Sequence, residues 1–284
     1  MNRIDFSDRI ISAKTIVIKV GSARVSGSNS EVNDFLFHLA KDIRELRDKK
    51  KNIILVSSGA VAQGKKILNE LGIKKKSSSV PERQALAAMG QSKLMNLYEG
   101  IFSKVNIPIA QILFGSTEIG TSTGYRNIQN TFNQLLDWQI LPIINENDST
   151  AIEELKLGDN DMLSALVSIL IKADLLVILT GVDGFLKNNK LVSHLNEITE
   201  KDLSLALGPE GPGTGGMNTK LVAGKILSSV GVLTGIINGK EKGNLNAFLE
   251  GKNIGTLISS NKKKLNVSEM QTRELFKLVG DDNV

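Results

Sequence analysis

The stretch Ile140-Leu141-Pro142-Ile143-Ile144-Asn145-Glu146-Asn147-Asp148 decides the fold, because an apolar run here passes directly into a cluster of amides and carboxylates. Residues 140–144 predict a buried β-strand, and residues 162–173 predict a helix. The connection over 145–161 holds three asparagines, three aspartates and three glutamates, far more than a simple turn needs. Such a loop can hold a polar ligand or a metal, and it can equally be a hairpin with a helix cap.

The chain on either side of this stretch alternates between strand-like and helix-like patterns. Short apolar or β-branched runs predict further strands at 15–20, 53–56, 109–113, 175–179 and 232–237. Amphipathic spacing predicts helices at 32–47, 60–71, 82–104, 128–138 and 217–229, and Asn188-Asn189 predicts a hairpin turn. Strands that alternate with helices predict an α/β protein, a three-layer αβα sandwich with a mostly parallel sheet. Without a repeat or a long linker, a single domain over 1–284 is expected.

Composition narrows the class of protein. The chain has no cysteine, which excludes disulfides and thiolate nucleophiles, and its two histidines disfavour a His-ligated metal centre. The net charge of +5 comes largely from lysine triplets typical of solvated surface, and the 4% aromatic content offers little for bases to stack on. We therefore expect no nucleic-acid partner. No signal-peptide pattern or membrane-spanning apolar run is found, so we expect a soluble, cytoplasmic protein.

Polar groups follow four of the predicted strands at the point where each strand ends. The segments are Lys19-Val20-Gly21-Ser22, Ser57-Ser58-Gly59, 145–148 and Thr180-Gly181. In a mostly parallel sheet, ligands bind outside the carboxyl ends of the strands. Lys19 is the most informative, because burying a lysine in an apolar strand is costly unless an anion meets it. The alternative is that Lys19 extends to solvent from the strand end.

Two segments are placed to bind anions at helix amino termini. Ser57-Ser58-Gly59 opens the helix predicted at 60–71, although capping alone also explains these residues. The glycine-rich run 208–216 leads into a helix with Lys220 in its first turn, where a cation is disfavoured unless an anion is nearby. The run is not a P-loop, because GxxxxGK[ST] does not occur, and a surface loop is the alternative.

Two lysines, two glycine-containing turns and a carboxylate cluster fit phosphoryl transfer. Catalysis of this reaction is mostly positioning plus neutralisation of charge by lysines and magnesium. A carboxylate acceptor needs no general base, which suits a site without histidine. No Ser/His/Asp set can be assembled, and the acidic loop lacks EF-hand spacing because of Leu163.

Five segments form an ordered set: VIKVGS (17–22), VSSGAVA (56–62), INEND (144–148), GDND (158–161) and GTGGMNTK (213–220). Together they resemble the signature segments of the glutamate 5-kinases, which belong to the amino-acid kinase family. The resemblance implies that about 14–173 bind the amino acid, that about 174–260 bind ATP and that 261–284 form a short tail. The implied reaction is ATP-dependent phosphorylation of the L-glutamate side-chain carboxylate to L-glutamyl 5-phosphate, the first step of proline synthesis.

The resemblance also implies roles for the residues at these motif positions. Lys19 and Lys220 would neutralise the transferring phosphoryl group, and Asp161 would hold both lysines in place. The glutamate site would be lined by Ser58, Gly59, Asn145, Asp148, Asp159 and Asn160. ATP would contact Lys19, Gly21, Ser22, Thr180, Gly181, Thr214, Gly215, Gly216, Met217, Asn218, Thr219 and Lys220. Mg2+ would be held mainly by the ATP phosphates, without an assigned protein ligand.

Partners are implied in the same way. The resemblance predicts L-glutamate as substrate, proline as feedback inhibitor, a homodimer or homotetramer, and functional coupling to glutamate-5-semialdehyde dehydrogenase. The chain ends at Val284, so we expect it to lack the RNA-binding-like PUA domain that many members carry at the carboxyl terminus. Residues 267–278 are expected to form one helix.

Two positions depart from the family pattern, and two other functions remain open. Most members of the family have Asp directly after the threonine that corresponds to Thr180, whereas this chain has Gly181. In the loop before Lys220, Asn218 replaces a residue that is usually small. One alternative is another amino-acid kinase, such as an acetylglutamate or aspartate kinase, against which the INEND and GDND segments argue. The other is a non-catalytic sensor of an amino acid, a nucleotide or RNA. The pairing of Lys19 with Lys220 argues against the sensor.

Overall fold

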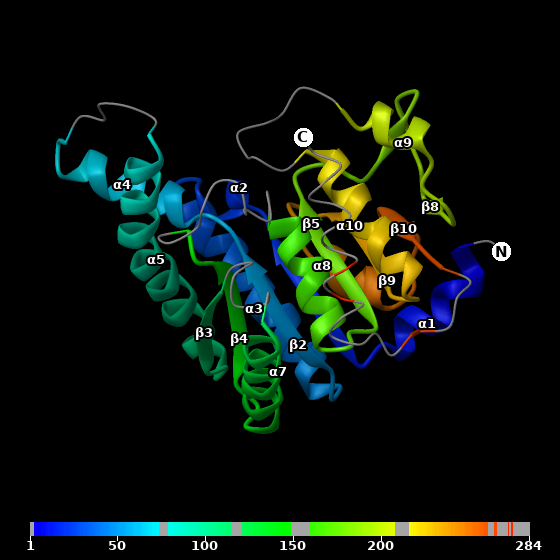
Figure 1. Ribbon diagram of the computed structural model, residues 1–284, viewed down its shortest axis with the longest axis horizontal. Helices are drawn as coiled ribbons and strands as arrows, with labels where there is room; N and C mark the ends of the chain where they lie inside the picture. Colours follow the sequence, from blue (N-terminus) through cyan, green and yellow to red (C-terminus); the bar gives the residue numbers. More distant parts are fainter. Residues whose placement is uncertain are drawn as a thin grey trace.

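The centre of the molecule is an eight-stranded, mostly parallel sheet (Figure 1). The computed structural model describes residues 3–73, 79–114, 121–148, 160–207 and 216–260, with Lys264, Leu265, Thr272 and Glu274. The strand order is β3-β4-β2-β1-β5-β9-β10-β8, and only β10 pairs antiparallel to its neighbour β9. The strands are β1 (Thr15–Val20), β2 (Asn52–Ser57), β3 (Ile109–Phe114), β4 (Leu141–Glu146), β5 (Leu175–Thr180), β8 (His194–Leu195), β9 (Leu233–Asn238) and β10 (Thr256–Ile258).

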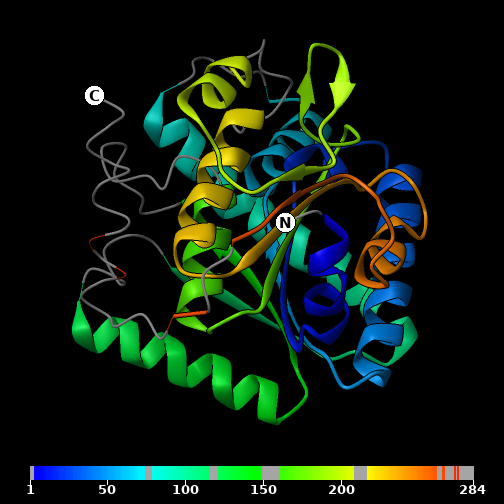
Figure 2. The same cartoon turned by 90° about the vertical axis from the view of Figure 1, so that its right-hand side faces the viewer.

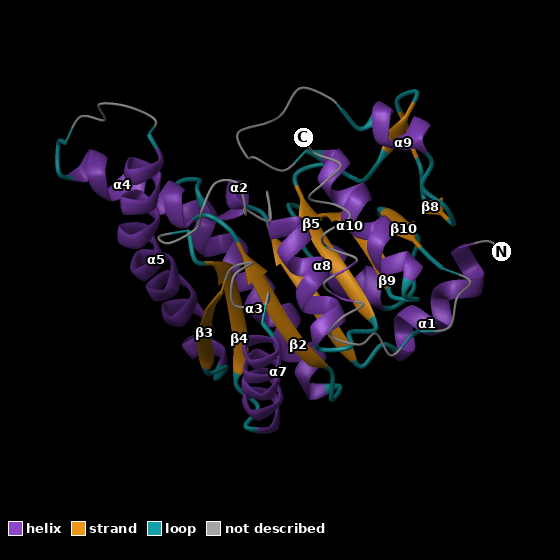
Figure 3. Ribbon diagram, viewed as in Figure 1, coloured by secondary structure: helices purple, strands orange, loops and turns teal. Residues whose placement is uncertain are grey.

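Helices cover both faces of this sheet, which confirms the predicted three layers (Figures 2 and 3). One face packs against α1 (Ser7–Ser12), α3 (Asn29–Asp48), α5 (Val80–Phe102) and α11 (Asn244–Leu249). The other packs against α7 (Ser122–Asp137), α8 (Asn160–Leu170) and α10 (Met217–Ser229).

The alternation of side chains along β1 decides where the lysine of this strand lies. Ile16 and Ile18 belong to the core under α3 and α5, whereas Val17 belongs to the core under α8 and α10. Successive side chains of a strand point to opposite faces. Lys19 therefore lies on the same face as Val17, toward α8 and α10.

Helices α4 (Ala60–Glu70) and α5 form a hairpin at one side of the molecule (Figure 1). The two helices approach closely at Gly64 and Gly90. A Cβ at Gly90 would lie 1.8 Å from the Ala60 carbonyl oxygen, and one at Gly64 would lie 2.0 Å from the Leu86 carbonyl oxygen. Glycine is therefore required on both helices, and the contact fixes the start of α4.

Several element boundaries differ from the sequence prediction. Strand β4 continues through Asn145 and Glu146, which were expected in the following loop, and α8 begins at Asn160 rather than 162. Helix α7 begins six residues earlier than predicted, since Thr121 accepts a hydrogen bond from the Gly124 N–H and caps it. The short elements α9 (Glu200–Leu205), α11, β8 and β10 were not anticipated.

The predicted hairpin is present between β6 (Leu186–Lys187) and β7 (Lys190–Leu191). Asn188 and Asn189 both have positive φ, 52° and 59°, as the favoured two-residue turn requires. The helix expected at 267–278 falls almost wholly outside the described residues. Among the described helices, none combines the length and apolarity needed to cross a membrane.

Candidate active site

The carboxyl ends of four neighbouring strands meet at one edge of the sheet. Strand β1 pairs in parallel with both β2 and β5, and β2 pairs in parallel with β4. The segments after these strands are the four singled out from the sequence. The fold therefore brings Lys19, Ser58, Asn145 and Thr180 to the same edge.

Asp161 lies between the two lysines that the sequence marked. Its Oδ1 is 2.7 Å from the Lys19 Nζ, and its Oδ2 is 2.9 Å from the Lys220 Nζ. The hydroxyl of Thr219 donates a further hydrogen bond to Oδ2 at 2.8 Å. Lys19 comes from β1, Asp161 from the first turn of α8, and Lys220 from α10.

Burial gives this cluster its electrostatic character. Asp161 is fully buried, and Lys19 and Lys220 are 3% and 7% exposed. Charges are this deeply buried only when they are paired. One carboxylate between two ammonium groups leaves an excess positive charge, so the cluster is suited to binding an anion.

The amino terminus of α10 adds to the same positive region. Gly216 is the residue before the helix, and its carbonyl oxygen accepts a hydrogen bond from the Lys220 Nζ at 3.1 Å and lies 2.9 Å from the Thr219 hydroxyl oxygen. This bond folds Lys220 back over the first turn. The helix dipole and the ammonium group therefore act together on any anion that binds here.

The two departures from the family pattern have simple structural consequences. The Asn218 side chain donates to the Leu203 carbonyl oxygen at 3.0 Å, so it ties α10 to α9. At Gly181, an added Cβ would lie 3.8 Å from the Lys240 Cε, which is ordinary contact distance. A side chain at position 181 is therefore sterically allowed, beside a lysine.

A chain of amide groups lies next to the lysine cluster. The Asn160 Nδ2 donates to the Asn145 Oδ1 at 2.8 Å and to the Ser57 carbonyl oxygen at 2.6 Å. The Asn145 Nδ2 donates to the Gln91 Oε1 at 2.9 Å. Gln91, on α5, was missed in the sequence, because a lone glutamine inside a long helix carries no pattern that distinguishes it from surface.

A cavity of about 290 Å³ opens beside these amides, close to the lower size limit of small-molecule sites. Gln91 and Asp148 both line it. Glu146, only 8% exposed, lines the same cavity. The complete lining is Ala60, Ala87, Ala88, Gln91, Ser92, Gln111, Leu113, Glu146, Asn147 and Asp148.

The turn after β2 is held firmly on both sides. The Ser57 hydroxyl lies 2.8 Å from the hydroxyl of Tyr98, whose pKa burial raises. Gly59 has a φ of 110°, and a Cβ there would meet the Val25 Cγ2 at 2.4 Å, so this position needs glycine. The Ser58 Oγ is buried and has no hydrogen-bond partner within the described part of the chain.

The remaining predicted residues divide into two groups. Gly21, Ser22 and Thr180 lie at the strand-end edge, with Gly21 preceding the short helix α2 (Ser22–Val25). Asp159, Thr214 and Gly215 fall outside the described residues.

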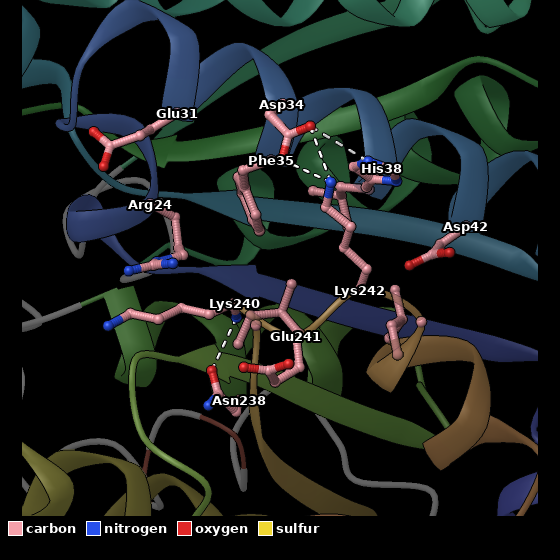
Figure 4. A pocket seen from close by; sticks show the side chains of 15 residues that line it. Arg24, Glu31, Asp34, Phe35, His38, Asp42, Asn238, Lys240, Glu241 and Lys242 are labelled. Atoms are coloured by element: carbon pink, nitrogen blue, oxygen red, sulfur yellow. Dashed lines mark hydrogen bonds and ion pairs between the residues drawn. The ribbon is translucent and has the colours of Figure 1, made fainter.

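A second cavity, of about 160 Å³, lies on the α3 side of the sheet (Figure 4). Carboxylates and amines line it together: Asp34 of α3 pairs with Lys242 at 3.1 Å and with His38 at 3.4 Å. Arg24 and Lys240 extend along its other side (Figure 4). None of the residues predicted for catalysis or binding lines this cavity.

Comparison with known sequences relates the chain to one family. A profile of the Amino acid kinase family matches residues 14–237. The glutamate 5-kinase of Clostridium tetani is 41% identical over 257 residues, which span 87% of this chain and 95% of that protein. The glutamate 5-kinase of Enterococcus faecalis is 42% identical, spanning 88% and 96%, and that of Thermus thermophilus is 38% identical, spanning 89% and 69%.

Solved structures share the fold at low sequence identity. N-acetylglutamate synthase from Neisseria gonorrhoeae superposes with a TM-score of 0.65 at 19% identity, covering 92% of this chain and 63% of that chain. Giardia carbamate kinase gives 0.60 at 18% identity, covering 88% and 100%. UMP kinase from Bacillus anthracis gives 0.57 at 14% identity, covering 88% and 97%.

Proposed function

This chain belongs to the amino acid kinase family, and we propose that it transfers the γ-phosphoryl group of ATP to the side-chain carboxylate of L-glutamate. The product is L-glutamyl 5-phosphate, an intermediate of proline synthesis. Relatives that are 38–42% identical along most of the chain are glutamate 5-kinases. The observation that carries the proposal is the buried Lys19–Asp161–Lys220 cluster beside a polar cavity at the strand-end edge.

The chemistry needs no general base from the protein. An oxygen of the glutamate side-chain carboxylate forms a bond to the γ-phosphorus, the bond from that phosphorus to the bridging oxygen breaks, and ADP leaves with the electron pair. The acceptor is already ionised at neutral pH, so no proton has to move.

The lysines act on the charge of the transferring group. Lys19 and Lys220 place two ammonium groups where negative charge spreads over the phosphoryl oxygens. Asp161 acts as a positioning residue, because its two oxygens hold one lysine each. Since the three groups are buried, they need little reorganisation when the phosphoryl group arrives.

The amide cluster and the cavity form the proposed glutamate site. Asp148 and Glu146 supply negative charge for the substrate ammonium group, and Asn145 and Asn160 supply fixed amides. The backbone amides that follow Ser58 are available to a substrate carboxylate at the start of α4.

The residues present fit magnesium bound through the nucleotide. Within the described residues, no group of three or more histidines or carboxylates is arranged to hold a metal ion. Asp161 is shared by two lysines, and Mg2+ commonly keeps phosphate and water ligands. When bound with ATP, the ion supplies further neutralisation of the phosphate charge.

The test is a hydroxamate assay with purified protein, MgATP, glutamate and hydroxylamine. Formation of γ-glutamyl hydroxamate, dependent on both ATP and glutamate, is the expected result. N-acetylglutamate and aspartate serve as competing acceptors in parallel reactions. Phosphorylation of either of these in place of glutamate, or binding of an amino acid without turnover, would overturn the proposal.

Finer properties are proposed from the family resemblance. They are inhibition by proline, a homodimer or homotetramer, coupling to glutamate-5-semialdehyde dehydrogenase, and a cytoplasmic location. Addition of proline to the hydroxamate assay tests the first, and sedimentation of the purified protein tests the second.

A further inference from the structure

We infer that Gln91 fixes the polarity of the amide cluster and binds a carboxylate of the substrate through its own NH2 group. The inference rests on the proposed function, because it concerns the glutamate site. It assigns a specificity role to a residue of α5, on a different element from the strand-end and helix-start residues discussed above.

Two backbone groups set the direction of every hydrogen bond in the cluster. The Glu146 N–H, which can only donate, lies 2.9 Å from one side-chain atom of Asn145, so that atom must be oxygen. The Ser57 carbonyl, which can only accept, faces Asn160 at 2.6 Å, so Asn160 presents its NH2 group there. The direction of both asparagine amides is therefore decided by the main chain.

The orientation of the Asn145 amide in turn decides the orientation of the Gln91 amide. Because the Asn145 Oδ1 accepts from Glu146 N and from Asn160, its Nδ2 is the group that faces Gln91, at 2.9 Å. Only the oxygen of the Gln91 amide can accept that bond. The NH2 group of Gln91 is then left for the cavity that this residue lines.

The charge of the cavity makes such a donor useful. Glu146 and Asp148 line it, which suits the ammonium group of an amino acid but repels its carboxylates. An amide NH2 from Gln91 offers a carboxylate two donors without adding a charge. Gln111 also lines the cavity, but it is exposed and lies outside the hydrogen-bonded chain from Ser57 to Gln91.

The decisive variant is Gln91→Glu, which keeps the shape and the acceptor for Asn145 but replaces NH2 by a carboxylate oxygen. We expect the KM for glutamate to rise by at least 20-fold, while the KM for ATP stays within threefold and Tm within about 3 °C. Gln91→Met, which removes both the donor and the acceptor, should raise the KM for glutamate by about 5-fold to 10-fold and also lower kcat, because Asn145 and Asn160 lose their fixed orientation.

Gln129→Glu is the matched control for a structural glutamine. Gln129 lies on α7, on the opposite face of the sheet from α5, and donates to the Leu170 carbonyl oxygen at 2.8 Å. This change should lower Tm and leave both KM values unchanged. If Gln91 served only to pack α5 on β4, its variants would likewise lower Tm and leave the KM values for glutamate and ATP unchanged.

The outcomes separate this inference from the proposed function. An active wild-type enzyme whose KM for glutamate is unchanged within twofold in Gln91→Glu overturns the role of Gln91 alone. If Gln91→Glu is folded but inactive, calorimetric titration with glutamate decides: lost binding supports the role, and retained binding overturns it. A wild-type protein that forms no hydroxamate overturns the proposed function and this inference together.

Discussion

At the scale of single residues, Asp161 explains why two lysines can be buried in one site. Each of its oxygens meets one ammonium group, at 2.7 Å and 2.9 Å. A third partner, the Thr219 hydroxyl, restrains the carboxylate from the amino-terminal turn of α10. The lysines are therefore held in place before a ligand binds, which is the arrangement that electrostatic stabilisation of a transition state requires.

The first prediction concerns these lysines. Lys19→Ala and Lys220→Ala should each lower kcat by about 100-fold or more, with a much smaller change in the KM for glutamate, because their charge matters most in the transition state. Each variant should stay folded, since Asp161 keeps the other lysine. Steady-state kinetics in the hydroxamate assay is the measurement.

Lys225→Ala is the control for this pair. Lys225 lies on the same helix as Lys220 and pairs with Glu200 at 2.8 Å on the surface, so its removal should leave kcat unchanged. Equal losses of rate and glutamate affinity in the Lys19 or Lys220 variants would contradict a transition-state role.

The second prediction at this scale concerns Asp42, whose pKa is raised to about 6 by burial and by the nearby Glu45. A carboxyl with a raised pKa favours the folded state while it is protonated, below its unfolded pKa of about 3.9. That contribution is lost as the pH rises through 6. Asp42→Asn should therefore raise Tm at pH 7.5, and the difference from wild type should shrink between pH 6 and pH 4.

Asn246 makes this substitution conservative, because its Nδ2 donates to the Asp42 Oδ1 at 3.3 Å and an asparagine oxygen accepts the same bond. Thermal unfolding at a series of pH values checks the prediction. Asp34→Asn is the comparison, since Asp34 pairs with Lys242 and its loss should not stabilise the fold at any pH. A Tm difference for Asp42→Asn that does not depend on pH would refute the assignment.

At the scale of elements, the sequence predicted the positions of the long helices and the buried strands, with α7 and β4 each wrong at one end, and it predicted the short elements poorly. Strand β1 and helix α10 have the bounds that periodicity predicts, because both bury continuous apolar patterns. Helix α11 and strand β10 have six and three residues, too few to show a period. Their stability comes from tertiary packing around Phe248 and Leu257.

The candidate site was predictable where a polar residue interrupts an apolar element. Lys19 inside β1 and the amides after residue 144 stand out for this reason. Gln91 did not, because its partner Asn145 is 54 residues away and helices carry many solvated glutamines. The extent of β4 was also missed, since Asn145 and Glu146 are polar but buried.

The third prediction tests the contact between α4 and α5. Gly90→Ala places a methyl group 1.8 Å from the Ala60 carbonyl oxygen and 2.3 Å from the Gly64 nitrogen, both of them backbone atoms. The helices must separate, at a cost of about 3 kcal/mol in the free energy of unfolding. Because Ala60 begins α4 directly after Gly59, the KM for glutamate should rise as well.

Gly100→Ala on the same helix is its control, because a Cβ there meets no atom within 4 Å. This change should stabilise the protein by about 0.5–1 kcal/mol, as alanine does in a helix interior. Denaturant unfolding of both variants gives the free energies. Equal effects at Gly90 and Gly100 would show that the helices do not approach as closely as described.

At the scale of the whole molecule, one sheet joins the two expected halves of the chain. Strand β1, which carries Lys19, pairs with β2 of the first half on one side and with β5 of the second half on the other. The two halves therefore share one sheet, and no linker separates Lys19 from the half that carries Lys220. The division near residue 173 into a glutamate half and an ATP half stays a prediction. Its physical basis is that Lys19 belongs to the first expected half and Lys220 to the second, and that Asp161 pairs with both.

Arg3 anchors the amino-terminal segment at the β10–β8 edge of this sheet, which the sequence did not reveal. It lies in the 3-10 helix η1 (Arg3–Phe6) and is only 8% exposed. Its guanidinium donates to the carbonyl oxygens of Ser193, Gly255 and Ile254 at 2.6, 2.9 and 2.5 Å, and lies 5.5 Å from the centre of the Phe248 ring. Burial lowers its pKa to about 10, which leaves it charged at neutral pH.

The fourth prediction follows from these contacts, which join the start of the chain to β8, β10 and α11. Arg3→Ala removes a charged donor from three carbonyl oxygens, of which that of Ser193 keeps the Leu257 N–H, so the free energy of unfolding should fall by about 3 kcal/mol. Arg3→Lys should lose a similar amount, because one ammonium group cannot satisfy carbonyls spread around a planar guanidinium.

Arg126→Ala is the control, because Arg126 is an exposed arginine on α7; this change should alter the free energy of unfolding by less than about 0.5 kcal/mol. Arg3 lies at the β10–β8 edge of the sheet, with β5 and β9 between β1 and β10, so turnover at 20 °C should be unchanged. A loss of turnover in folded Arg3→Ala would show that this edge of the sheet is coupled to Lys19.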